Sequence, residues 1–505
     1  MARFPGAHLI ERLSIRKLVT YRAALGAVLV AALAIRVASF TLWSGAIHPD
    51  ETFQYLEQAH RLAFGAGVVP WEFQDGIRSW LLPGALAGLM RAARWIDADP
   101  WTYIVLIRLA CATLSLSVVY IGFRLAWETS GLAAGVLAGA YGALWFEAIY
   151  FAPAALPDVL GAHVALGAIY LGSRGDRETA GRIAFSGALL GLAFCLRFQL
   201  APALAAAAAW NYRLDRRRWQ TAALGAAAVI VPVLGVLDWL TWGAPFQTVW
   251  LNVVRNVIDG VSEGFGTAPW YTYPRMVWWS WTPVAVPLAA LAVAGTRRAP
   301  ALAVAALITV ITHSFISHKE YRFIYLALAI APIMMGLGAA ECIAWIRRRL
   351  GPAAAMTAGM TLLFYVAGAS AYGATHGYLA DRWAIDSSNL RAFLSANRTP
   401  GICGLGVAGI QTSHTGGYTY FDRAVPLYLP AEGGGAVAAP IVKLAGRVVP
   451  MYSPDEMLAH TDRFNALIAP AAAAPPGFAK RSCFPSQLRD AQPEICLFVR
   501  AGECR

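Results

Sequence analysis

The chain has 505 residues, of which 58% are hydrophobic and only 14% are charged, and its mean hydropathy is +0.51. Soluble globular proteins carry about 25% charged residues, so this composition excludes an ordinary soluble domain and indicates a membrane protein. The formal net charge of +12 predicts no nucleic-acid partner, because the arginines form short clusters between apolar runs, as in the cytoplasmic loops of membrane proteins.

Apolar stretches long enough to cross a bilayer, about 20 residues each, recur from Tyr21 to about Ala374. We therefore expect residues 1–374 to form a transmembrane domain. Basic residues surround the start of the first stretch, and no small-residue cleavage site follows it, so we expect a retained helix with a cytoplasmic N-terminus. The basic residues are Arg12, Arg16, Lys17 and Arg22.

Further arginine clusters at 213–218, 297–298 and 347–349 mark cytoplasmic loops. The loops between them must alternate, which predicts three external segments. They are a first loop with surface helices at about 44–100, a loop at about 243–280 and a hairpin at about 317–322. The whole pattern predicts a polytopic α-helical membrane protein with about eleven transmembrane helices.

Two arrangements satisfy these charge clusters. Either Trp80 to Ala93 crosses the membrane and Ile183 to Trp210 is one long helix, or the first lies on the outer surface and the second is a hairpin of two short helices that turns at Arg197. We prefer the hairpin, because an arginine near the middle of the bilayer costs about 2.5–3.5 kcal/mol even on the most lenient scale.

Residues 375–505 lack a run long enough to span a membrane and are richer in polar residues, Pro and Gly. We expect them to form a soluble α/β domain on the external, periplasmic side. Its four cysteines fit disulfides in an oxidising compartment, with three connectivities open. A zinc site is the alternative, but no Cys-x-x-Cys spacing favours it. The cysteines are Cys403, Cys483, Cys496 and Cys504.

The first external loop contains the acidic motif His48-Pro49-Asp50-Glu51. Pro49 suits the first turn of a helix, and acids that follow it complement the helix dipole, so a purely structural role is one interpretation. Apolar residues such as Phe53, Leu56 and Ala59 continue as a stripe, which predicts a helix lying along the membrane interface. Such a helix would hold the acids at the membrane edge.

The external hairpin packs His318, Lys319, Glu320 and Arg322 into five residues. Charge in a short loop needs no special explanation, but this density also suits a bound lipid phosphate, which lysine binds as a point charge and arginine as a fork. Asp158 and Arg197 lie near the ends of apolar stretches. Their side chains are candidates to reach the same outer vestibule as the acidic motif and the hairpin, or to form a structural ion pair with each other.

Together these motifs resemble glycosyltransferase family 22, a branch of the GT-C superfamily that includes the dolichyl-phosphate-mannose-dependent mannosyltransferases of N-glycan and GPI-anchor assembly. The ordered motifs are His48-Pro49-Asp50-Glu51 with Gln54, then Trp71-Glu72-Phe73 with Ile77-Arg78-Ser79, and finally His318-Lys319-Glu320-Tyr321-Arg322-Phe323.

The resemblance implies inverting transfer of a sugar, mannose being the first expectation, from a polyprenyl-phosphate donor to a hydroxyl of a lipid-linked or membrane-tethered acceptor. By position, Asp50 or Glu51 is the general base, with Asp50 preferred, and the hairpin binds the donor phosphate through Lys319, Arg322 and His318. The further substrate-binding candidates are His48, Gln54, Trp71, Glu72, Arg78, Asp158, Arg197 and Glu320. No cofactor is implied, although the paired acids are compatible with a divalent cation.

A composition rich in Ala and Arg, without an organelle retention signal, favours a bacterial inner-membrane protein. Two other functions stay open. A transporter or flippase of a lipid-linked or polar substrate should show inverted repeats, and none is evident. A non-catalytic assembly protein would use the C-terminal domain to bind partners.

Overall fold

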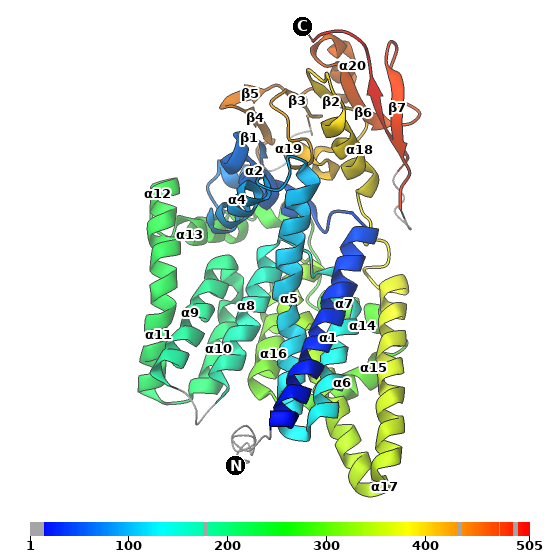
Figure 1. Cartoon of the computed structure of the whole chain (residues 1–505). Helices are drawn as coiled ribbons and strands as arrows, with labels where there is room; N and C mark the ends of the chain where they lie inside the picture. Colours follow the sequence, from blue (N-terminus) through cyan, green and yellow to red (C-terminus); the bar gives the residue numbers. More distant parts are fainter. Residues whose placement is uncertain (1–14, 175–178, 432–436, 474, 488–492, 505) are drawn as a thin grey trace.

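The computed structural model describes residues 15–174, 179–431, 437–473, 475–487 and 493–504. It shows a helical bundle with β-sheets and short helices gathered at one end (Figure 1). Helix α1 (Ile15–Leu42) begins at the opposite end and runs toward the sheets. It therefore delivers the chain to the sheet end just before the acidic motif. Arg12 lies outside the described residues.

The bundle consists of apolar helices of very different lengths. After α1 come α5 (Pro100–Ser130), α6 (Leu132–Leu144), α8 (Pro157–Gly172), α9 (Ala180–Leu196), α10 (Ala201–Tyr212), α11 (Arg216–Ile230) with its continuations η5 (Val231–Leu237) and α12 (Asp238–Trp242), α15 (Ala285–Gly295), α16 (Pro300–Ser314) and α17 (Tyr325–His376). Helix α17 contains a break at Gly351, where φ is 90°.

Within the described residues, four helical runs are long and apolar enough to cross a membrane. A fifth arises if α14 (Thr272–Trp281) and α15, which meet at 111°, are taken as one span. Several shorter apolar helices lie among them, and the expected number of about eleven crossings stays a prediction. The four runs are Leu18–Leu42, Pro100–Ser130, Arg216–Trp242 and Tyr321–His376.

The segment from Ile183 to Trp210 is not one helix. Helix α9 ends at Leu196, Arg197 adopts an extended conformation, and the 3₁₀ turn η4 (Phe198–Leu200) leads into α10. The preferred hairpin of two short helices is therefore confirmed. Helix α4 (Leu81–Ala93) packs against α2 (Glu57–Phe64) and against α5, at the sheet end of the bundle (Figure 1).

The C-terminal region contains both helices and strands, while the separate soluble domain expected there stays a prediction. Helix α18 (Ser387–Arg398) packs on a five-stranded sheet whose three central strands are buried. The strand order is β3 (Leu427–Tyr428), β2 (Leu405–Val407), β6 (Ala466–Pro470), β8 (Ile495–Val499) and β7 (Ala479–Phe484), with β2 parallel to β3 and β6, and β8 antiparallel to both its neighbours.

A second sheet joins this domain to the first external loop. Strand β1 (Ala66–Val69) pairs antiparallel with β4 (Ile441–Leu444), and β4 pairs with β5 (Arg447–Val449). Three strands are thus shared between parts of the chain that we expected to be separate. The C-terminal domain is consequently packed as part of the same body as the first loop, while its expected boundary at residue 375 stays a prediction.

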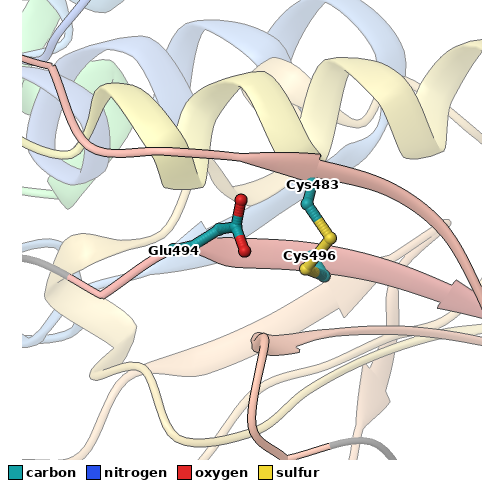
Figure 2. A group of neighbouring side chains, drawn as sticks. All are labelled: Cys483, Glu494 and Cys496. Atoms are coloured by element: carbon teal, nitrogen blue, oxygen red, sulfur yellow. A yellow bond between two sulfur atoms is a disulfide. The ribbon is translucent and has the colours of Figure 1, made fainter.

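The four C-terminal cysteines form two disulfides, Cys403–Cys504 and Cys483–Cys496. The second joins opposite residues of β7 and β8, with Glu494 close by (Figure 2). Two cysteines and a carboxylate so placed resemble a metal site. The sulfur atoms are bonded to each other, however, so the two thiolates that such a site needs are not there. The structure selects one of the three connectivities.

The remaining short elements complete the sheet end and the loops around it. They are η2 (Glu51–Leu56), α3 (Trp71–Gln74), α7 (Phe146–Tyr150), α13 (Gln247–Val253), η6 (Val254–Ile258), η7 (Val261–Phe265), η8 (Tyr321–Ile324), η9 (Thr412–His414), α19 (Gly417–Tyr420), α20 (Pro454–Ala459) and η10 (Thr461–Arg463).

Helices α9 and α11 approach each other through glycines. A Cβ atom at Gly187 would overlap the backbone carbonyl of Ala222, and one at Gly225 would overlap that of Ala184. Small residues at such contacts allow two helix backbones to come close and pack over a large area. This close packing supports the wall of the bundle next to the break at Arg197.

Replacing Gly187 by leucine (Gly187→Leu) should therefore separate α9 from α11. We expect a loss of about 1–3 kcal/mol in the free energy of unfolding, because the backbone of Ala222 cannot move aside without disturbing its own helix. The melting temperature of the detergent-purified protein measures this. Gly181→Leu on the same helix is the control, since nothing lies within 4 Å of a Cβ there; equal melting temperatures for both variants would contradict the prediction.

Candidate functional site

The acidic motif lies at the start of a buried helical segment. Asp50 precedes the π-helical turn η2, which continues into α2. We expected one face of this segment to lie exposed at the membrane interface, but every residue from 51 to 60 is buried. The reason is tertiary: the C-terminal domain covers the face that the sequence pattern leaves polar, and Glu57 accepts hydrogen bonds from the backbone and hydroxyl of Thr419.

Arg322 is the centre of the site. Its guanidinium binds three carboxylates, with nitrogen–oxygen distances of 2.5 Å to Asp50, 2.6 Å to Glu320 and 3.4 Å to Asp158. The Arg322 side chain is only 7% exposed, whereas that of Asp50 is 26% exposed. The hairpin cation and the first-loop acid, which lie far apart in the sequence, are therefore in direct contact.

A second ring of polar side chains surrounds this cluster. Arg197 pairs with Asp158 at 2.8 Å. His48 and His318 each contact Glu320, at 3.0 and 3.1 Å. Three carboxylates thus face two guanidinium groups, and the histidines lie where protonation would add positive charge. The ion pair expected between Asp158 and Arg197 is present, and it belongs to the same vestibule as the two motifs.

The charges of this cluster determine how its acids titrate. Burial alone would raise the pKa of Asp50, but the attraction of Arg322 and His48 outweighs it and lowers that pKa below its usual value. Burial alone would also raise the pKa of Glu320, but the attraction of Arg322 and of the two histidines outweighs burial and lowers that pKa. Both groups are therefore carboxylates at neutral pH.

A polar arm extends from Asp50 toward α3. Gln54 donates to Glu72 at 2.6 Å and accepts from Arg78 at 2.9 Å. Burial raises the pKa of Glu72 to about 7, against the opposing attraction of Arg78. Trp71 is buried beside this arm and stacks on Phe265. The arm fixes the orientation of the Arg78 guanidinium.

Arg78 and Arg197 line a cavity whose empty space, including the part open to solvent, is about 520 Å³. Its walls come from the first loop, from the break between α9 and α10, and from α13. Tyr55, Gln199 and Asn252 add polar groups to the lining, and Leu82, Phe194 and Leu234 add apolar ones. A cavity lined by two cations and by apolar side chains suits a ligand that has an anionic head and a hydrocarbon tail.

Two of the predicted site residues point elsewhere. Glu51 accepts backbone hydrogen bonds from Ala155 at 2.7 Å and from Ile47 at 3.2 Å, so its carboxylate anchors the loop to the segment before α8. Lys319 donates to the carbonyls of Ser314 and Ile316, at the C-terminal end of α16. Asp50 and Glu51 therefore do not face a common partner, and Lys319 does not reach the carboxylates that hold Arg322.

Sequence reasoning missed Glu147, which binds the hairpin through Tyr321. Its carboxylate accepts hydrogen bonds from the indoles of Trp145 and Trp281, at 2.9 and 3.2 Å, and from the hydroxyl of Tyr321. Tyr321 directly precedes Arg322, so Glu147 fixes the backbone that carries the central cation. The available signal was a single acid at the end of an apolar run.

Comparison with known proteins gives one consistent family. Residues 27–392 match the Alg9-like mannosyltransferase family. The GPI alpha-1,2-mannosyltransferase 3 of Danio rerio is 25% identical over 355 residues, which cover 68% of this chain and 63% of the relative. The GPI mannosyltransferase 3 of Yarrowia lipolytica is 28% identical over 348 residues, covering 64% of this chain and 63% of the relative. The match thus spans less than two thirds of each relative's length.

The fold is also found among solved structures. ArnT from Cupriavidus metallidurans, solved with undecaprenyl phosphate bound, superposes with a TM-score of 0.55 at 14% identity, covering 96% of this chain and 98% of that one. The apo structure of the same protein gives a TM-score of 0.53. This likeness confirms the GT-C type of fold that the motifs predicted.

Replacing Arg322 by glutamine (Arg322→Gln) should leave three carboxylates without their shared cation. We expect the free energy of unfolding to fall by about 3–5 kcal/mol at neutral pH, the usual consequence of removing one partner from a buried ion pair. In the wild-type protein the lowered pKa values of Asp50 and Glu320 contribute stability that is present above the ordinary carboxyl pKa of about 4 and is lost only as pH falls through the lowered values.

In the Arg322→Gln variant the neighbouring carboxylates favour protonation. Lowering the pH from about 7.5 to about 5 should therefore reduce the deficit, which is the difference in free energy of unfolding between the wild type and the variant. Melting temperatures at the two pH values measure it. Arg255→Gln is the control, because Arg255 forms partly exposed pairs with Asp75 and Asp259 and should change stability by less than about 1 kcal/mol. A deficit of Arg322→Gln that grows on acidification would disprove this account.

Proposed function

The chain belongs to the Alg9-like mannosyltransferase family, and on that premise we propose that it transfers mannose from a polyprenyl-phosphate donor to a hydroxyl group of a lipid-linked or membrane-tethered acceptor. The observation that carries the proposal is the position of Asp50. This ionised carboxylate is held by Arg322, which also binds Asp158, and Asp158 in turn pairs with one of the two arginines that line the cavity, Arg197. The ArnT structure of the same fold was solved with a polyprenyl phosphate, the class of carrier proposed here.

Asp50 is the proposed general base. Arg322 binds Oδ2 of Asp50. The other oxygen of Asp50, Oδ1, accepts no hydrogen bond among the described residues and lies 3.7 Å from His48. Oδ1 of Asp50 takes the proton of the acceptor hydroxyl while the hydroxyl oxygen attacks the anomeric carbon of the sugar. The bond from that carbon to the phosphate oxygen breaks, so a single displacement inverts the anomeric configuration. The phosphate leaves with both bonding electrons and needs no strong acid.

Arg78 and Arg197 are the proposed contacts of the donor phosphate, because both line the cavity. Cations there would stabilise the negative charge that the leaving phosphate gains in the transition state. Arg322 is proposed to position Asp50, since its guanidinium is already shared among three carboxylates. His318 and Lys319 are secondary candidates, because their nitrogens already bind Glu320 and the end of α16.

Glu51 is proposed to hold the acid loop in place and to take no part in proton transfer. Both its oxygens accept backbone amides, and burial raises its pKa. Gln54 and Glu72 are proposed to orient Arg78, and Trp71 to support that arm. The arginine clusters support a reaction on the external face, which in a bacterium is the periplasmic face of the inner membrane.

The function is tested with purified protein, polyprenyl-phosphate mannose and a membrane lipid extract, with the mannosylated product identified by mass spectrometry. Asp50→Asn should lower kcat by about 10²- to 10⁴-fold, the usual contribution of a general base. Its melting temperature should fall less than that of Arg322→Gln, because Glu320 and Asp158 still hold Arg322. Glu51→Gln should instead lower the melting temperature and retain measurable transfer.

Asp75→Asn is the matched control, because Asp75 lies in the same loop and pairs with Arg255 away from the cavity. Its rate should equal that of the wild type. Full activity of Asp50→Asn would remove Asp50 as the base. Turnover of a different polyprenyl-phosphate sugar without any transfer of mannose would exclude mannose and retain the reaction class.

The role of Arg78 is tested separately. Arg78→Gln should raise the KM for the polyprenyl-phosphate donor by roughly tenfold or more, the effect of losing one charged hydrogen bond to phosphate, and Arg78→Lys should recover part of it. The KM for the acceptor should stay within about twofold. Unchanged donor KM in Arg78→Gln would exclude this residue as a phosphate contact.

A further inference from the structure

A second cavity lies at the other end of the bundle. Its empty space, including the part open to solvent, is about 910 Å³, and its walls are formed by α5, α8 and the first turn of α9. Asp158 of the catalytic cluster lies in the first turn of α8, and Tyr170 of the cavity follows it by about 18 Å along the helix axis, at 1.5 Å per residue. This end of α8 lies away from the β-sheets (Figure 1). The cavity is therefore distinct from the proposed active site.

Basic side chains dominate the polar part of this cavity. Arg124 and Arg174 share the single carboxylate of Glu128, with nitrogen–oxygen distances of 2.8 and 2.5 Å. The third arginine, Arg182, makes no side-chain hydrogen bond or ion pair with any residue that the structure describes, and its Nε is buried. Among the described residues, three guanidinium groups thus face one carboxylate, an excess of positive charge.

A buried guanidinium nitrogen without a hydrogen-bond acceptor costs free energy, and an anionic ligand would remove that cost. Phosphate oxygens suit arginine best, because the guanidinium can bind two of them at once. Apart from Ser117, the remaining walls are apolar or aromatic and include Ile121 and Leu171. Tyr120 also lines the cavity and is 38% exposed, so the cavity opens on the outer surface of the bundle, where acyl chains lie.

From these features we propose that the cavity binds the phosphate headgroup of an anionic membrane lipid. The arginines lie at the ends of α5 and α8, the level at which headgroups meet transmembrane helices, and basic pockets between such helices bind anionic headgroups. A soluble anion would use the charges but leave the apolar walls and the opening toward lipid unexplained. The ligand is therefore a structural lipid and not the sugar donor.

The experiment uses the full-length protein in detergent with three probes: dioctanoyl phosphatidylglycerol, dioctanoyl phosphatidylcholine and inorganic phosphate. Native mass spectrometry counts the bound lipid, and the shift in melting temperature follows its affinity. The wild-type protein should bind the anionic lipid at least roughly tenfold more tightly than the zwitterionic one, and Arg182→Gln should weaken the anionic lipid by about tenfold.

Two further variants separate binding from folding. Arg217→Gln removes the same charge from an exposed position on α11 and should bind the anionic lipid as the wild type does. Gly167→Leu fills the cavity without a change of charge, and a Cβ at Gly167 meets only Leu189, at 3.8 Å. It should fold normally and lose the lipid.

Three results would overturn the proposal. One is equal affinity of the wild-type protein for the two lipids, and another is unchanged affinity in both Arg182→Gln and Gly167→Leu. The third is stabilisation by inorganic phosphate without any preference for the anionic lipid, which would identify a site for a soluble anion instead.

Discussion

One guanidinium group, that of Arg322, holds together three segments that are far apart in the chain. Asp50 comes from the first loop, Asp158 from the start of α8 and Glu320 from the hairpin before α17. A buried cation without such partners would be strongly destabilising, and so would three buried carboxylates without the cation. Each segment can therefore occupy its place only when the others are present, and the whole outer vestibule depends on this charge balance.

The first loop is held from two sides by carboxylates that bind backbone amides. Glu51 binds the segment before α8, and Glu57 accepts from Val68 within the loop and from Thr419 of the C-terminal domain. Strand β1 adds a ladder with β4. These contacts surround Asp50 without using its free oxygen. The C-terminal domain thereby covers the loop and reduces its freedom, which is the kind of preorganisation that the proposed role of Asp50 as a base requires.

The break at Arg197 shows how the bundle accommodates a cation. A continuous helix from Ile183 to Trp210 would place this arginine among apolar neighbours, at a high cost in free energy. The break instead lets the Arg197 side chain pair with Asp158 and line the cavity that Arg78 also lines. The sequence left a structural ion pair and a place in the vestibule as alternatives for these residues. They are compatible, because Arg197 lines the cavity while it pairs with Asp158.

Composition and spacing along the chain were enough to predict a membrane protein, the interruption at Arg197 and the two motifs at one end of the bundle, because these properties depend on local hydropathy and on the alternation of charged loops. The external position of the C-terminal domain stays a prediction. Only the tertiary structure decided which side chains meet. Asp50 and Arg322 are 272 positions apart, and nothing local distinguishes Asp50 from Glu51 or Arg322 from Lys319. The pairing of cysteines, the sheet shared by β1 and β4, and the support of Tyr321 by Glu147 depend in the same way on contacts between distant segments, where the requirement to satisfy every buried charge and hydrogen-bonding group selects one arrangement.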